Sequence, residues 1–99
     1  MIARHAIYRL VGDGQLVIVL SYPGLEQGGS VVVAPLSSAD EIAVIPVLHP
    51  KVKTPEGERY AVIERLAAIA LRELDVEIGR HEDDQFEISH ALSRLFDGT

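Results

Sequence analysis

The sequence predicts a mainly β fold, an antiparallel sheet curled into a small barrel and followed by one C-terminal helix. Two observations predict it. Apolar runs rich in β-branched residues, separated by turns that contain Gly and Pro, occupy the first two thirds of the 99 residues. From His81 onward the apolar period becomes that of an amphipathic helix. The length suits a single domain over residues 1–99.

The first two predicted strands cover Ala6 to Val11 and Gln15 to Ser21, with Gly12-Asp13-Gly14 as the turn between them. The second run contains five successive apolar residues, which suits a strand that is buried on both faces. The segment Tyr22 to Gly29 contains Pro and three Gly, so we expect a surface loop that carries Leu25.

Two further strands are expected before residue 50. Ser30 to Ala34 forms the third, and Pro35 to Asp40 is expected to end it in a turn because proline cannot continue a central strand. Glu41 to His49 is predicted as the fourth strand, in which Pro46 indicates an edge or a bulge.

Thr54-Pro55-Glu56-Gly57 predicts a hairpin, and Glu58 to Arg65 after it alternates as a strand does. Leu66 to Leu74 is ambiguous, because its residue types favour helix whereas strand-like runs flank it. The terminal helix is expected to be capped by Asp83 or Asp84. Its apolar stripe recurs at helical spacing and comprises Ile88, Ala91, Leu92, Leu95 and Phe96.

Composition limits the possible functions. The absence of cysteine excludes disulfides, thiolate metal sites and a cysteine nucleophile. The formal net charge of −6 and the scattered basic residues argue against nonspecific nucleic-acid binding, in which cations replace the counterions of phosphate. We expect a cytoplasmic protein with a protein partner, with no signal peptide and no membrane span.

Three stretches carry a resemblance to a known family. They are VVVAPLSSA at 31–39, IPVLHP at 45–50 and the ending RHEDDQFEISHALSRLFDGT at 80–99. In this order and spacing they resemble the CcdB family, the toxins of toxin–antitoxin pairs. The resemblance extends over essentially the whole chain.

The resemblance implies an SH3-like β-barrel of the CcdB/MazF type with a C-terminal helix, assembled as a homodimer. It makes Leu66 to Leu74 a strand, against its local propensity. It implies a protein that poisons the DNA gyrase A subunit by trapping cleaved DNA and that a CcdA-like antitoxin neutralises. Such a toxin performs no chemistry, so no catalytic residues, cofactor, metal or direct nucleic-acid contact are expected.

Carried over by position, the gyrase-binding residues lie mostly at the end of the chain. They are Ser93, Phe96, Asp97, Gly98 and Thr99, with Leu25 from the loop as an addition. Asp97 stands where the best-known family tail has tryptophan, and loss of such an anchor commonly costs ~2 kcal/mol or more of binding.

Two alternatives remain. A protein with this barrel could bind an antitoxin or another protein without acting on gyrase. It could also be a MazF/Kid-like endoribonuclease, in which Arg4, His5 or Arg9 on the first strand would supply a cation for the scissile phosphate and a base for the 2′-hydroxyl.

Other polar groups have simpler explanations. The acidic residues from Glu82 to Asp84, after His81, suit the positive end of a helix dipole better than a metal site. His90 and Ser89 have no acid placed to complete a nucleophile relay. His49 is expected to be a hydrogen-bonded structural histidine.

Overall fold

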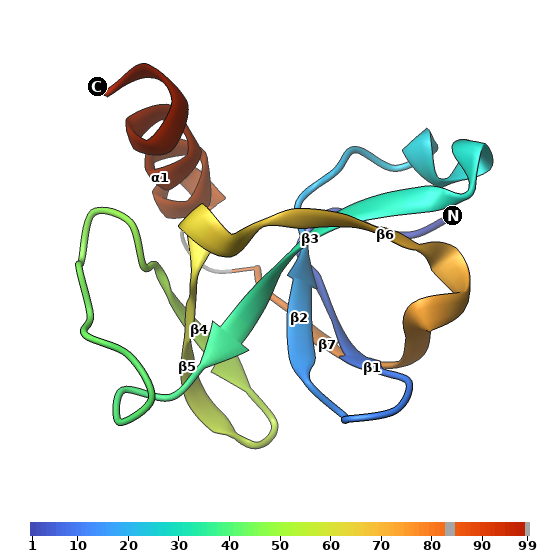
Figure 1. Cartoon of the computed structure of the whole chain (residues 1–99), viewed down its shortest axis with the longest axis horizontal. Coiled ribbons are helices and arrows are strands. Elements are labelled where there is room, and N and C mark those ends of the chain that lie inside the picture. Colours follow the sequence, from blue (N-terminus) through green and yellow to red (C-terminus); the bar gives the residue numbers. More distant parts are fainter. Residues whose placement is uncertain (83–84, 99) are drawn as a thin grey trace.

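The computed structural model describes residues 1–82 and 85–98. A seven-stranded antiparallel sheet leads into one helix near the C-terminus (Figure 1), which confirms the predicted class. The strands are β1 Ala6–Leu10, β2 Leu16–Val19, β3 Ser30–Ser37, β4 Lys51–Thr54, β5 Gly57–Ala61, β6 Ala67–Ala70 and β7 Leu74–Arg80. The helices are the 3₁₀ turns η1 Leu25–Gly28, η2 Ile63–Arg65 and η3 Leu71–Glu73, and α1 Gln85–Asp97. None of the helices described is long and apolar enough to cross a membrane.

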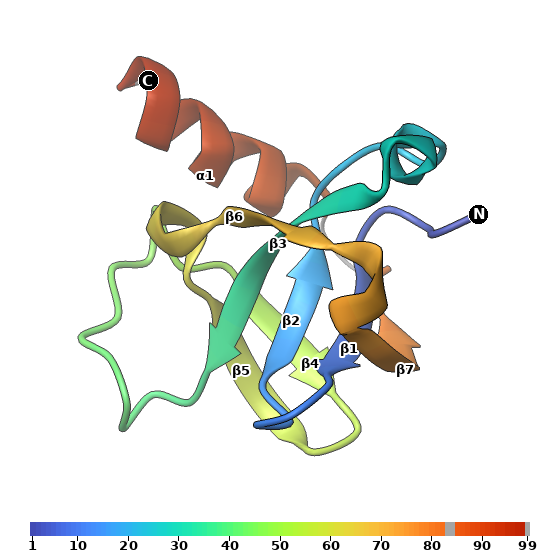
Figure 2. The ribbon, with the colours of Figure 1, turned by 45° about the vertical axis from the view of Figure 1, so that its right-hand side comes forward.

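Strand β3 gives the sheet its curl. The strand order is β4-β5-β3-β2-β1-β7, and β6 also pairs with β3. The first half of β3 pairs with β6, from Ser30 opposite Ala70 onward, whereas its end pairs with β5 at Leu36 and Ser37. Figures 1 and 2 show β6 at one end of β3 and β5 at the other. One long strand therefore joins two parts of the sheet.

The expectation that Pro35 ends the third strand is wrong. β3 continues through Pro35, which lies opposite Val17 of β2. The Pro35 carbonyl accepts a hydrogen bond from the N–H of Val62, so its missing N–H lies on the same side of the strand, between β6 and β5. The proline thus costs β3 no ladder hydrogen bond there.

Strand β2 is buried on both faces, as predicted. Leu16 and Ile18 pack in one apolar cluster with Ile7, whereas Val17 and Val19 pack in a second cluster on the other side. Every residue of β2 is buried. The first cluster extends to the helix and the second to the N-terminal segment.

The fourth predicted strand, Glu41 to His49, is not formed. This stretch is an irregular loop, although it is an almost continuous apolar run. The N–H of Ile45 donates to Nδ1 of the buried His49 at 2.9 Å. Nδ1 is therefore the acceptor, and Nε2–H donates to the Glu64 carboxylate at 2.9 Å. The imidazole ties the loop to η2, so His49 has the structural position expected for it.

The ambiguous stretch Leu66 to Leu74 is mainly extended, as the family resemblance implied. β6 takes up 67–70 and η3 takes up 71–73, before β7 begins. Pairing of β6 with β3 overrides the local helical propensity. The hairpin predicted around Thr54–Gly57 is present between β4 and β5.

Helix α1 packs on the core through part of its predicted stripe. Ile88 and Ala91 are buried in the first cluster, and Leu92 and Leu95 lie half-buried against it. Phe96 departs from the stripe and is 69% exposed. The proposed caps, Asp83 and Asp84, lie outside the described residues.

Candidate functional site

Pairing of β1 with β7 brings two Arg-His dipeptides together. Arg4-His5 immediately precedes β1, Arg80 is the last residue of β7 and His81 follows it. The register places Ala6 opposite Arg80, so the residues before one strand lie beside those after the other. The N–H of His81 donates to the carbonyl of His5 at 2.9 Å. The site is therefore fixed by a strand pair and not by a loop.

These residues line a cavity of about 580 Å³, a volume within the range usual for small-molecule sites. We refer to it as the Arg-His cavity. Its lining residues come from the ends of β1 and β7 and from the first turns of α1, and they are Arg4, His5, Arg80, His81, Glu82, Phe86 and Ser89.

His5 has a strained backbone. Its φ is +68°, in the left-handed region, which carries a cost of roughly 1–3 kcal/mol for residues other than glycine and recurs at functional sites. The backbone is held there from two sides. The His5 N–H donates to the Val19 carbonyl at 2.7 Å, and the His5 carbonyl accepts from His81. The imidazole is thereby directed to the cavity wall.

The imidazole of His5 is 5% exposed and is held neutral. Burial, together with the positive charges of Arg4 and of His81 when protonated, lowers the pKa of His5 from 6.5 to about 4. Nε2 of His5 and Nε of Arg4 are buried without a hydrogen-bond partner in the described part of the chain. An unsatisfied buried polar atom costs about 1–3 kcal/mol, which marks this pair as candidates for function.

Two guanidinium groups line the cavity, those of Arg4 and Arg80. The Arg4 guanidinium lies over the ring of Tyr22, 4.7 Å from its centroid, and Arg80 donates through Nη2 to Glu77 at 3.1 Å. Within the described residues, Glu82 contributes the carboxylate of the lining. The cavity therefore brings two permanent cations together in a chain whose net charge is −6.

This arrangement suits an anionic ligand and proton transfer. Arginine is the side chain best fitted to bind phosphate oxygens. Two imidazoles on the same wall, His5 and His81, have ring centroids 6.2 Å apart and an edge-to-face orientation. A group bound in the cavity can therefore contact both rings, one as base and one as acid.

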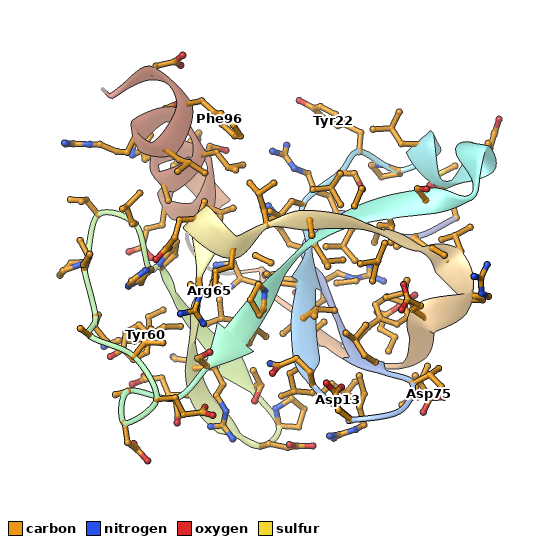
Figure 3. All side chains as sticks on the ribbon, viewed as in Figure 1. Asp13, Tyr22, Tyr60, Arg65, Asp75 and Phe96 are labelled. Carbon is orange, nitrogen blue, oxygen red and sulfur yellow. The ribbon has the colours of Figure 1, made fainter. Side chains whose placement is uncertain are left out.

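Leu25 and Phe96, predicted as gyrase-binding residues, come together elsewhere. Both line an apolar groove of about 290 Å³, here called the tail groove, between α1 and the Tyr22 loop. Figure 3 shows Phe96 and Tyr22 on the two sides of this region. The other main lining residues are Leu20, Val32, Leu66 and Leu92.

Three other predicted residues are not among those that line this groove. Ser93 and Asp97 are exposed on α1, and Gly98 follows the helix with φ +73°. Thr99 lies outside the described residues. Of the five predicted positions that the structure describes, the groove brings together Leu25 and Phe96.

Arg9, named with Arg4 and His5, is separated from them by the strand. It lies on β1 and forms an ion pair with Glu56 of the β4–β5 hairpin. Within the described residues, no group of three His, Asp or Glu side chains is placed to hold a metal ion. Arg80 and His81 were not assigned a catalytic role from the sequence, although the repeated Arg-His dipeptide was a signal that could have found them.

In sequence, the chain matches no protein-family model and no curated protein. In structure, it is similar to an endoribonuclease in complex with its cognate antitoxin from a mycobacterial species, with a TM-score of 0.78, 18% identity and coverage of 96% of this chain and 94% of that one. It is also similar to the Mycobacterium tuberculosis toxin MazF-mt6, with a TM-score of 0.78, 18% identity and coverage of 93% and 96%. These proteins share its fold. A mycobacterial endoribonuclease has a TM-score of 0.76, 18% identity and coverage of 95% and 89%.

The comparison bears on two expectations from the sequence, the absence of catalysis and the CcdB-like fold. The expectation that the chain performs no chemistry is contradicted, because the solved structures with this fold include endoribonucleases, which are enzymes that act on RNA. The expected absence of nucleic-acid contact rested on the same assumption. The SH3-like barrel of the CcdB/MazF type is confirmed as a fold, with MazF as the neighbour, whereas membership of the CcdB family is not shown.

Proposed function

We propose that this chain is an endoribonuclease toxin of a toxin–antitoxin pair and that the Arg-His cavity is its active site. One observation carries the proposal. On a fold shared with endoribonucleases, two arginines and two histidines from separate strand ends converge in a single cavity. The antitoxin partner follows from the neighbour that is bound to its cognate antitoxin.

The cavity residues match the steps of RNA cleavage. Arg4 and Arg80 would hold the phosphate and stabilise the charge that develops on its oxygens. Neutral His5 would accept the proton of the 2′-hydroxyl as O2′ bonds to phosphorus. As the bond from phosphorus to the 5′-oxygen breaks, protonated His81 would donate a proton to that oxygen. The products are a 2′,3′-cyclic phosphate and a 5′-hydroxyl end.

This mechanism explains why a base with so low a pKa is usable. At neutral pH His5 is in the accepting form, and the phosphodiester monoanion of bound RNA would offset the positive charge of Arg4 that contributes to the lowered pKa. The base therefore strengthens when substrate is bound, which is when the proton must be transferred.

The direct test is incubation of the purified protein with an RNA oligonucleotide and with DNA of the same sequence. We expect cleavage of the RNA alone, with 2′,3′-cyclic phosphate ends, because DNA lacks the attacking hydroxyl. Intact RNA in the presence of folded protein would refute the proposal.

A second candidate function, binding of the DNA gyrase A subunit, is favoured by the tail groove. Leu25 and Phe96, both carried over as gyrase-binding positions, line this one exposed apolar surface. Asp97 places a charge at the next position, whose burial is unfavourable unless it is paired. If gyrase binds there, Asp97→Trp should increase affinity roughly 30-fold, measured by titration of gyrase supercoiling. No inhibition by either form would exclude gyrase as the target.

A further inference from the structure

Phe86 is an exposed aromatic residue at the edge of the Arg-His cavity. Its side chain is 72% exposed, and it lines the cavity together with Ser89, three residues further along α1. Residues three apart share one face of a helix, so Phe86 and Ser89 form the helical wall of the site. Ile88 and Ala91 occupy the face that packs on the core.

The position of Phe86, rather than its exposure, is informative. Single exposed apolar residues are ordinary on protein surfaces. Phe86, however, lies outside the apolar stripe that attaches α1 to the sheet, and it lines the same cavity as two arginines and two histidines.

An aromatic ring beside a cationic pocket is a combination that suits nucleotides. The phosphate of a nucleotide is bound by cations, and its base stacks on an aromatic face, which contributes about 1–3 kcal/mol per base in single-stranded complexes. The cavity of about 580 Å³ is large enough for a phosphate and part of the attached sugar, with the ring at its edge.

The ring of Phe86 is also supported from its own helix. His90, one turn further along, has its ring centroid 6.5 Å from that of Phe86, with the two planes inclined by 33°. Such i, i+4 neighbours restrict the positions open to an exposed side chain. A restricted ring loses less conformational entropy when a base stacks on it.

We propose that Phe86 stacks on the nucleobase next to the phosphate bound in the Arg-His cavity and so positions the nucleotide for cleavage. The inference rests on the proposed ribonuclease function, and it assigns Phe86 a binding role that fold similarity does not supply. A stacked base must be unpaired, so the substrate segment at the cavity is single-stranded.

The composition of the chain provides a sensitive probe. There is no tryptophan, and the only phenylalanines are Phe86 and Phe96. Phe86→Trp and Phe96→Trp each introduce a single fluorophore at an exposed position of the same helix, about 15 Å apart along its axis. Only the first lies at the cavity.

The ligand is a short 2′-O-methyl oligoadenylate, which keeps bases and phosphates but cannot be cleaved. We expect it to quench the fluorescence of Phe86→Trp and to leave that of Phe96→Trp unchanged. An oligomer with abasic sugars should not quench either. Quenching of both variants, or of neither, would overturn the stacking role.

Affinity gives a second measurement. Phe86→Leu keeps the apolar bulk without the π face, and it should weaken binding of the oligoadenylate roughly 5- to 150-fold, while Phe86→Trp should restore it. Because the side chain is exposed, the midpoint of urea unfolding should not change. Equal affinity of wild type and Phe86→Leu would contradict the proposal.

The two proposals fail in different ways. RNA cleavage by the wild type without quenching at position 86 would overturn the stacking role and leave the ribonuclease function intact. Quenching without any cleavage of RNA would support stacking while it refutes the catalytic proposal. Absence of both would overturn both.

Discussion

His5 combines features that seldom occur together without a functional reason. It is a buried imidazole with a left-handed backbone, an unsatisfied ring nitrogen and a lowered pKa. Each of these lowers the stability of the fold, and together they concentrate at the cavity wall. The surrounding strands must offset that cost, and the hydrogen bonds from His5 to Val19 and His81 show how the residue is held.

The lowered pKa of His5 predicts a loss of stability on acidification. In the unfolded chain the imidazole binds a proton near pH 6.5, whereas in the folded chain it does so only near pH 4. Between these values the unfolded state binds more protons, so the free energy of unfolding falls as pH decreases, by on the order of 1–3 kcal/mol over the whole window. His5→Asn, which tolerates a positive φ, should remove this part of the pH dependence.

Urea unfolding at pH 6.5 and pH 5 provides the measurement. This range lies above the region in which the carboxylates with lowered pKa, Glu26, Glu41 and Glu64, lose their contribution. Identical pH slopes for wild type and His5→Asn would mean that His5 is not the buried neutral group described here.

At the scale of elements, the loop from Ser38 to Pro50 depends on one side chain. Its described residues include no strand. Nδ1 of His49 accepts from Ile45 within the loop, and Nε2 links the loop to Glu64 of η2. His49→Ala would leave the Ile45 N–H and the Glu64 carboxylate without this partner. The expected cost is about 1–3 kcal/mol in the free energy of unfolding, measured with urea.

Glu64→Gln is the matched control for that change. The amide oxygen of glutamine can still accept from Nε2–H of His49, so the cost should stay below about 1 kcal/mol. If His49→Ala were no more destabilising than Glu64→Gln, the loop would be held by other contacts.

Sequence patterns correctly predicted the elements that depend on neighbouring residues in the chain. The five successive apolar residues predicted that β2 is buried on both faces, and Thr54–Gly57 predicted the turn of the β4–β5 hairpin. Glu41 to His49 is also an apolar run, interrupted by Pro46, but a strand forms only where a partner edge is available, and the sequence pattern does not report that. β3 passes through Pro35 for the converse reason, since the missing donor faces a gap between two partners.

Only some residues of the candidate site could be predicted from the sequence, because the others are brought to it by contacts between distant parts of the chain. Arg4 and His5 could be named from the sequence as groups that suit RNA chemistry. Their partners Arg80 and His81 are more than 70 positions away along the chain, and only the register of β1 with β7 places them together. Phe86 joins the site through the position of α1, which depends on the packing of Ile88 and Ala91 on the core.

For the whole molecule, a net charge of −6 contrasts with a candidate site that contains two guanidinium groups. A chain with a charge of −6 does not attract RNA over long distances, and the Debye length of about 8 Å at physiological salt limits how far its repulsion extends. If the proposed function is correct, recognition of RNA depends on close contacts within the Arg-His cavity rather than on long-range attraction.

The measurement that most directly tests the central claim compares RNA cleavage by wild type, His5→Asn and Arg94→Asn. Arg94 is exposed on α1 and does not line the Arg-His cavity, so its replacement controls for a nonspecific effect of a polar substitution near this side of the molecule. We expect His5→Asn to cleave about 10²- to 10⁴-fold more slowly, as for loss of a general base, and Arg94→Asn to match the wild type. Equal cleavage by wild type and His5→Asn would contradict the assignment of the active site to this cavity.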